Sequence, residues 1–393
     1  MFSKDTITRF ESLETPFYYY DLALLRQTLA ACKAASAQYG YHVHYAMKAN
    51  FNPKVLELIC KAGFGADCVS GNEVKAAIEH GFDKQQIVFA GVGKSDKEIN
   101  LALDAGIFCF NVESVQELQI IDDLAAAKNT TARVAIRINP NVDAHTHHYI
   151  TTGLDENKFG INIWQLDETV AMLRACENIQ FLGIHFHIGS QITDMEVFKS
   201  LCLRVNELQD WFENHGFTVK ILNTGGGLGV DYHNPDTNAC CDFESYFKVF
   251  KDFLHVRPGQ EVHFELGRAL VAQSASLISR VLYVKNGQKK NFLILDAGMT
   301  ELIRPMLYQA YHEIENLSRK QVTDSQLTTH NSQLKYDVVG PICESTDCFR
   351  KDVELPLSHR GDLIAIRTTG AYGEVMASSY NLRDGIHHVY TGD

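Results

Sequence analysis

Residues 41–62 read YHVHYAMKANFNPKVLELICKA, a short β-rich run followed by an amphipathic helical run. Residues His42 to Met47 have the composition of a strand, and apolar residues recur at helical spacing from Val55 to Ala62. A strand followed directly by a helix is the repeating unit of a parallel sheet, because the helix returns the chain to the start of the next strand. This stretch therefore predicts an α/β fold.

The same unit recurs along the chain as far as Glu265. The eight strand candidates are His42 to Met47, Ala66 to Val69, Ile87 to Ala90, Phe108 to Val112, Arg133 to Ile138, Phe181 to His187, Val219 to Asn223 and Val262 to Glu265. Helical patterns lie between them, as at Val55 to Ala62, Glu73 to His80, Lys97 to Ala105, Val115 to Ala127 and Phe198 to Phe217. Eight units over roughly 225 residues fit a (β/α)8 barrel of the TIM type, with a doubly wound sheet as the alternative.

The pattern changes after about Leu270 to extended runs separated by turn residues, which predicts a mainly β C-terminal domain. These runs are Leu277 to Val284, Asn291 to Leu295, Lys335 to Val339 and Asp362 to Arg367. The predicted domains are thus a barrel over 25–268 and a β-rich domain over 269–393. The run Pro16 to Tyr20, within 1–24, is expected to add a strand to the second domain and to bring the two chain ends together. The polar stretch Ser318 to Gln333 is interpreted as a loop.

Composition narrows the class of protein. The chain has 393 residues, 45% of them hydrophobic and 21% charged, which is typical of a globular protein with sizeable cores. A formal net charge of −12 argues against a broad nucleic-acid surface. Since no segment resembles a signal peptide or a membrane span, we expect a cytoplasmic protein without a membrane partner. Its ten cysteines are then expected to be reduced thiols.

Several residues suited to catalysis stand where barrel strands are predicted to end, and a barrel places its chemistry at those ends. Lys48 follows the first strand in YAMKAN. The sixth strand ends in HFHIGS, where two-residue alternation puts His185 and His187 on one face. A lysine in a loop is usually solvated and a buried histidine is often only a core residue, so these positions need support from the other strand ends.

That support comes from the last two strands. The seventh runs into NTGGG, where Gly225, Gly226 and Gly227 let the backbone approach an anion and donate its N–H groups. The eighth ends in ELGR, which adds the carboxylate of Glu265 and the guanidinium of Arg268. Barrels commonly bind phosphate in the loops after these two strands. An amine, a phosphate cradle and a separate carboxylate match the needs of pyridoxal phosphate, namely an aldehyde partner, a phosphate anchor and a partner for the pyridine nitrogen.

In order along the chain, YAMKAN, HFHIGSQ, NTGGGLG and ELGR resemble the motifs of the fold-type III pyridoxal-phosphate decarboxylases. The resemblance implies Lys48 as the Schiff-base lysine, His187 as the imidazole stacked on the cofactor ring, and Glu265 as the group that keeps the pyridine nitrogen protonated. The cofactor-binding residues that it implies are Lys48, His187, Ser190, Gly225, Gly226, Gly227, Glu265, Gly267, Arg268 and Tyr372. One departure is Leu266, where the family usually has proline.

The second domain contains segments that resemble the diaminopimelate decarboxylases within that family. They are DAGMTELIRPMLY at 296–308, GPICES at 340–345 and GAYG at 370–373. The resemblance implies release of CO2 and L-lysine from meso-diaminopimelate, with Cys343 as the proton donor to Cα and with Cys343 and Glu344 supplied by the partner in a homodimer. A substrate whose far end carries both an ammonium and a carboxylate needs an anion and a cation in its pocket. The substrate-binding residues so predicted are Arg268, Arg304, Tyr308, Glu344 and Tyr372.

Other interpretations are weaker but stay open. An arginine, ornithine or carboxynorspermidine decarboxylase shares the cofactor motifs, a racemase on the same barrel is conceivable, and so is a catalytically silent relative that binds cofactor or a partner protein. His145, His147 and His148 cluster with Asp143, but their spacing within an apparent loop, Pro140 to Ile163, does not favour a metal site. We interpret that loop as a cover for the active site and expect no metal.

Overall fold

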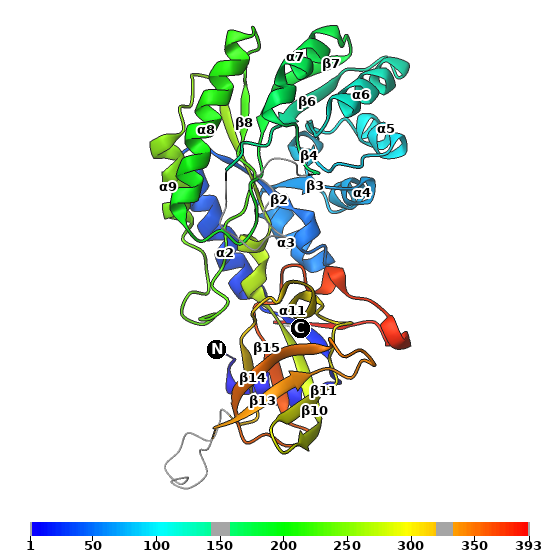
Figure 1. Ribbon diagram of the computed structural model, residues 1–393, viewed down its shortest axis with the longest axis vertical. Helices are drawn as coiled ribbons and strands as arrows, with labels where there is room; N and C mark the ends of the chain where they lie inside the picture. The colour runs from blue at the N-terminus through cyan, green and yellow to red at the C-terminus, as the bar shows by residue number, and fades with distance from the viewer. Residues whose placement is uncertain (1, 143–157, 320–332, 392–393) are drawn as a thin grey trace. The chain divides into compact units, whose positions relative to one another are not determined.

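The structure is a computed structural model that describes residues 2–142, 158–319 and 333–391 (Figure 1). It forms two compact units. One comprises Gln27–Gly229 and Asp242–Leu270, and the other comprises Met1–Arg26, Val230–Cys241 and Val271–Asp393. The cluster of Asp143, His145, His147 and His148 lies outside the described residues, as does most of the loops predicted at 140–163 and 318–333.

The first unit is a closed barrel of parallel strands in sequence order, from β2 to β9, and β9 pairs with β2 to complete it. The predicted barrel is therefore confirmed and the doubly wound sheet is wrong. The strands are β2 (His42–Ala46), β3 (Gly65–Cys68), β4 (Ile87–Phe89), β5 (Cys109–Val112), β6 (Ala132–Arg137), β7 (Ile179–His185), β8 (Ile221–Asn223) and β9 (Glu261–Leu266). Strand β7 ends two residues before the predicted His187, so this histidine lies in the segment that follows the strand.

Helices surround the barrel strands (Figure 1). They are α3 (Pro53–Lys61), α4 (Gly71–Glu79), α5 (Asp96–Ala105), α6 (Val115–Ala127), α7 (Leu166–Ala175), α8 (Met195–Asn214) and α9 (Phe243–Phe253), and α2 (Leu22–Ala37) precedes β2. Local sequence sets where they begin. Ser114 accepts a hydrogen bond from Glu117 N at the start of α6, and Asp194 accepts one from Glu196 N at the start of α8. Helix α6 thus starts soon after β5 ends, whereas α7 and α9 follow much longer segments after β6 and β8.

The second unit is built on a mainly antiparallel sheet with the strand order β12-β15-β10-β11-β13-β14, so the predicted mainly β domain is confirmed. Its strands are β10 (Ala275–Asn286), β11 (Asn291–Leu295), β12 (Ile314–Asn316), β13 (Gln333–Val339), β14 (Cys348–Pro356), β15 (Leu363–Ile366), β1 (Phe17–Tyr20) and β16 (His387–Tyr390). Strand β1 pairs with both β10 and β16. The expectation that residues 16–20 join this sheet and bring the chain ends together is confirmed.

Short helices accompany both units: α1 (Lys4–Glu11), α10 (Arg268–Val271) and α11 (Arg304–Tyr308). Within the described residues, no helix combines the length and the apolar character needed to cross a membrane.

Candidate active site

The carboxylate of Glu265 is the best-defined group at the C-terminal end of the barrel. It lies in β9 with only 5% of its surface exposed, and three side chains from three other strands donate to it. The Nδ2 atoms of Asn111 and Asn223 lie 2.8 and 2.7 Å from Oε1, and Nε2 of His185 lies 2.9 Å from Oε2. A buried carboxylate is stable only when it is hydrogen-bonded in this way.

These donors decide the charge of Glu265. Burial alone would raise the pKa of the carboxyl, but the charge and hydrogen bond of His185, with the hydrogen bond of Asn223, outweigh it and hold that pKa well below its usual value. The group is therefore a fixed anion. Two carboxylate oxygens offer about four acceptor positions, of which three are taken, so Oε2 can accept one further N–H.

The glycine loop lies directly beside this anion. Gly225 has a φ of +70°, a conformation that side chains with a Cβ rarely adopt, and Glu265 N donates to its carbonyl at 2.7 Å. A Cβ on Gly226 would collide with the carbonyl oxygen of Glu265. The loop is thus held against β9, and its third member, Gly227, accepts a hydrogen bond from Ile192 N at 2.9 Å. Bare backbone at this rim allows a ligand to approach the N–H groups closely.

Lys48 and His187 belong to the same rim. Lys48 lies in a 3-10 turn, Met47–Ala49, immediately after β2. Burial lowers the pKa of His187, and the neighbouring cations Lys48 and Arg137 lower it further, so the imidazole is neutral. In agreement, Gly226 N donates to its Nδ1 at 3.4 Å. The structure therefore brings Lys48, His187 and the glycine loop together.

A second buried carboxylate, Asp67 of β3, also belongs to this group. Burial raises its pKa and the nearby Glu265 raises it further, whereas Lys48 lowers it. Its Oδ1 has no hydrogen-bond partner among the described residues. A buried oxygen without a partner is costly, and the amine of Lys48 is one of the charged groups near this carboxyl.

The predicted phosphate residues Ser190 and Arg268 are also in contact. Nη2 and Nε of Arg268 lie 3.1 and 3.3 Å from Oγ of Ser190. Between Glu265 and Arg268, Gly267 has no room for a side chain, since a Cβ would lie 3.0 Å from Cβ of Ala49 and 3.1 Å from Cβ of Ala46. The close packing of Gly267 ties the start of α10 to the segment that carries Lys48.

In the second unit, Arg304 is a buried cation whose described partners are all neutral. It is 6% exposed, its Nη1 donates to the hydroxyl of Tyr232 at 2.9 Å and to the carbonyl of Ala371 at 3.5 Å, and its guanidinium lies 5.4 Å from the centre of the Tyr232 ring. Tyr308 is half-buried at the other end of the same helix, α11. Within the described part of the chain, no carboxylate pairs with Arg304, and a buried cation usually has an anionic partner.

The remaining predicted residues of this unit have different exposures. Cys343 and Glu344 are exposed in a turn before β14, where Cys343 N donates to Oδ1 of Asn381 at 3.0 Å. Tyr372 is half-buried and has a φ of +56°, which is uncommon for a residue other than glycine. Its neighbour Ala371 contacts Arg304 as described above, so Tyr372 and Arg304 lie in one region.

Sequence reasoning missed the residues that support Glu265. No local signal shows that the amides of Asn111 and Asn223 both turn toward one carboxylate on β9. Glu113 directly precedes the cap of α6 but does not cap this helix. In the structure it accepts from Gly91 N at 2.6 Å and from Arg137 at 2.9 Å, and Ser114 caps α6 instead.

Comparison with known proteins agrees with this geometry. Residues 25–272 match the family described as pyridoxal-dependent decarboxylase, pyridoxal binding domain. A protein of Bacteroides thetaiotaomicron named diaminopimelate decarboxylase is 56% identical over 388 residues, which cover 98% of each chain. The chain belongs to the diaminopimelate decarboxylase family. The resemblance stated from the sequence and the predicted cofactor, pyridoxal phosphate, are confirmed.

Solved structures of this family have the same fold. Diaminopimelate decarboxylase from Helicobacter pylori, crystallised with L-lysine, aligns with a TM-score of 0.89 at 38% identity, over 98% of this chain and 94% of that one. The enzyme from M. jannaschii, also in complex with L-lysine, aligns with a TM-score of 0.87 at 32% identity, over 98% and 89% of the two chains.

The residues at the barrel's C-terminal end fit the cofactor of the family. The open acceptor position on Oε2 of Glu265 suits the N–H of a protonated pyridine ring. The glycine loop, Ser190 and Arg268 offer donors to a phosphate, and Lys48 offers the amine near the buried, unpartnered Oδ1 of Asp67.

Proposed function

We propose that this protein decarboxylates meso-2,6-diaminopimelate to L-lysine and CO2, the last step of bacterial lysine biosynthesis, with pyridoxal phosphate held at Lys48. The observation that carries the proposal is the anionic Glu265, buried among three donors with one acceptor position left. Family membership supports the substrate, because the relatives that match over nearly the whole chain are named for it. When bound, pyridoxal phosphate supplies the electron sink for the bond that breaks at Cα.

The barrel residues hold and orient the cofactor. Lys48 provides the amine that binds the cofactor covalently, and Gly225 to Gly227, Gly267, Ser190 and Arg268 hold its phosphate. Glu265 keeps a proton on the pyridine nitrogen, because a fixed anion favours the protonated form of a neighbouring base. His187, neutral and held at the glycine loop, would pack on the cofactor ring. The catalytic residues in this proposal are Lys48, His187, Glu265 and Cys343.

The second unit selects the substrate. The buried guanidinium of Arg304, whose described partners are neutral, is suited to the distal carboxylate, and Tyr308, Arg268 and Tyr372 are the other substrate-binding residues of this proposal. Glu344 receives the distal ammonium. Ornithine and arginine have no distal carboxylate, so they would leave the charge of Arg304 without a partner.

Cys343 delivers the proton that replaces the carboxylate at Cα, so that one proton is consumed for each CO2 released. Its exposure, with that of Glu344, supports a homodimer in which a second chain covers this turn and receives both side chains. The proposal includes a cytoplasmic enzyme whose cofactor domain spans 25–268 and whose second domain spans 269–393 with a strand from 1–24.

A substrate panel tests the proposal. The purified protein, loaded with pyridoxal phosphate, is incubated separately with meso-diaminopimelate, ornithine, arginine and carboxynorspermidine, and CO2 and amine products are measured. We expect CO2 and lysine from diaminopimelate alone. Turnover of another substrate in preference to diaminopimelate would refute the substrate. A change in diaminopimelate stereochemistry without CO2 would indicate a racemase, and no turnover at all would indicate a silent relative.

A further inference from the structure

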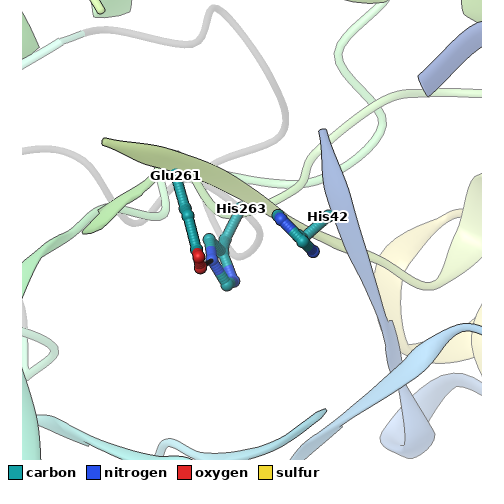
Figure 2. Close-up of side chains that lie close together, drawn as sticks. All are labelled: His42, Glu261 and His263. Carbon is teal, nitrogen blue, oxygen red and sulfur yellow. Dashed lines mark hydrogen bonds and ion pairs between the residues drawn. The ribbon is translucent and has the colours of Figure 1, made fainter. Parts of the chain in front are cut away.

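A second cluster of titratable side chains lies at the opposite, N-terminal end of the barrel. His42 begins β2, Glu261 begins β9, and His263 follows two residues later on the same face of β9. The two strands pair in register with His42 beside His263, and this pairing is the one that closes the barrel. Figure 2 shows the three side chains pointing to the same side of the two strands. They line a cavity of about 290 Å³.

A chain of hydrogen bonds passes through this cluster. The carbonyl of Gln86 lies 3.0 Å from Nδ1 of His44, Nε2 of His44 lies 2.8 Å from Nδ1 of His263, and Nε2 of His263 lies 3.1 Å from Oε2 of Glu261. Both ends of the chain are acceptors, a carbonyl and a carboxylate. Its three links need three protons, whereas two neutral imidazoles carry only two. The neutral rings can complete two of the links, and the third, between His263 and Glu261, can be completed by a third proton or by a metal ion.

The link between His263 and Glu261 is the one that a metal ion can occupy. His44 is 3% exposed and stacks on His263. When Nδ1 of His44 donates to the carbonyl of Gln86, Nε2 of His44 accepts from Nδ1 of His263. Nε2 of His263 is then the ring atom that faces a carboxylate oxygen of Glu261, and a metal ion can take the place of a proton between them.

The ligand geometry suits zinc. One ligand atom from each of His42, Glu261 and His263 lies within 4.8 Å of the others. Two ligand atoms on a tetrahedral zinc are about 3.3 Å apart for bonds of about 2.0 to 2.1 Å, close to the observed 3.1 Å between His263 and Glu261. Lys33, which also lines the cavity, donates to the carbonyl of Gly63 at 3.0 Å and is not a ligand.

We propose that His42, Glu261 and His263 bind a zinc-type divalent cation that joins the first and last strands of the barrel, with water completing its coordination. The ion is structural, since it lies at the end of the barrel away from Lys48 and Glu265 and bridges the β2–β9 seam. His44 is a positioning residue that fixes the tautomer of His263 through its hydrogen bond. The sequence did not indicate this site, because its ligands come from the two ends of the barrel sequence with no short metal-binding spacing between them.

The test measures metal binding by the holoenzyme after treatment with a chelator. Wild type, His42→Ala, Glu261→Gln and the control His80→Ala are dialysed against Zn²⁺ and analysed for bound metal. His80 is a half-buried histidine at the end of α4, and its Nδ1 lies 2.9 Å from the carbonyl of Ala76 in its own helix. We expect wild type and His80→Ala to bind one tight Zn²⁺ per chain. His42→Ala and Glu261→Gln should bind it at least about tenfold more weakly.

Co²⁺ in place of Zn²⁺ gives a second readout on the wild-type protein alone. We expect visible d–d bands of a four- or five-coordinate nitrogen and oxygen site, without the sulfur charge-transfer band that cysteine ligands would give.

Thermal unfolding is the third measurement. Zn²⁺ should raise the Tm of wild type and of His80→Ala but not of Glu261→Gln, which retains the side-chain size. Equal binding by all four proteins, no binding by wild type, or a sulfur-ligated Co²⁺ spectrum would each overturn the proposal.

Discussion

Strands β2 and β9 carry acidic and basic side chains at both ends, but the surroundings of these side chains differ. At the C-terminal end, Glu265 has three donors and remains an anion with one acceptor position left. At the N-terminal end, Glu261 faces His263 at 3.1 Å, and a ligand atom of His42 lies within 4.8 Å of both. One carboxylate is prepared for the N–H of a cofactor, the other for a metal ion. The donors around a carboxylate, more than its place on a strand, indicate its ligand.

The largest expected effect is the difference in activity between two variants, one at each end of the barrel. Lys48→Ala should lower kcat at least about 10⁴-fold and abolish covalent attachment of pyridoxal phosphate, because the amine that binds it is gone. His42→Ala, at the start of the strand that Lys48 follows, should leave kcat within about twofold of wild type. Borohydride reduction followed by mass spectrometry measures the attachment. A reduced cofactor adduct on another lysine of Lys48→Ala would show that Lys48 is not the anchor.

A second substitution separates cofactor binding at the barrel from the delivery of the proton. Cys343→Ala should lower kcat by about 10² to 10⁴-fold, the usual contribution of a general acid, while cofactor binding stays unchanged. Steady-state kinetics and the absorbance of the bound cofactor measure the two effects. Cys60→Ala, which changes a half-buried thiol of α3, is the control. Wild-type turnover by Cys343→Ala would remove this thiol from the mechanism.

The corresponding comparison along β9 uses two glutamates. Glu265→Gln should lower kcat by about a hundredfold or more, since a neutral amide no longer favours a protonated pyridine nitrogen. Glu261→Gln should leave kcat unchanged and lower the Tm in the presence of Zn²⁺. If the two variants lost activity equally, the two ends of the barrel would not have the separate roles assigned to them.

Substitution of Arg304, the buried cation of the second unit, should have a smaller effect, on KM. Arg304→Gln should raise KM for diaminopimelate about tenfold to a hundredfold. This change corresponds to the loss of a hydrogen bond to a charged group, which contributes about 1.5 to 3 kcal/mol to the free energy of binding. Arg280→Gln in the same unit, whose side chain donates to the carbonyls of Gly361 and Glu11, is the matched control. An unchanged KM in Arg304→Gln would assign the distal carboxylate to another residue.

The smallest effect is the pH dependence of stability that Glu265 imposes. Its pKa in the folded protein lies below the ordinary 4.5, so its ionisation favours folding at pH values above 4.5, and this contribution declines as the pH falls toward the folded value. The difference in unfolding free energy between wild type and Glu265→Gln should therefore decrease below pH 4.5. Urea unfolding of the cofactor-free proteins at several pH values measures it. A difference that grows on acidification would contradict the assigned charge state.

Much of the fold was predictable because periodicity is local. Strand β11 and helix α6 have the predicted bounds, and every barrel strand was found to within two residues. Strand β14 was missed, since CFRKDVELP carries charged residues at several positions and resembles a loop in isolation. It is a strand because it pairs with β13. Short strands such as β16 likewise depend on a distant partner, here β1.

The residues of the candidate site were likewise predictable only where they belong to a local motif. Residues in compact motifs, such as Lys48 and the glycine loop, could be predicted, and their roles stay predictions that the variants above test. The hydrogen bonds of Asn111, Asn223 and His185 to Glu265, and the cluster of His42, Glu261 and His263, join strands that are far apart in the chain. No local pattern specifies such contacts, because closure of the barrel creates them.

The most direct test of the proposed function is turnover of meso-diaminopimelate in D₂O with the protein loaded with pyridoxal phosphate. The account predicts lysine and CO2 in equal amounts, with one solvent deuterium on the carbon that lost its carboxylate. No lysine, or deuterium exchange into diaminopimelate without release of CO2, would contradict it.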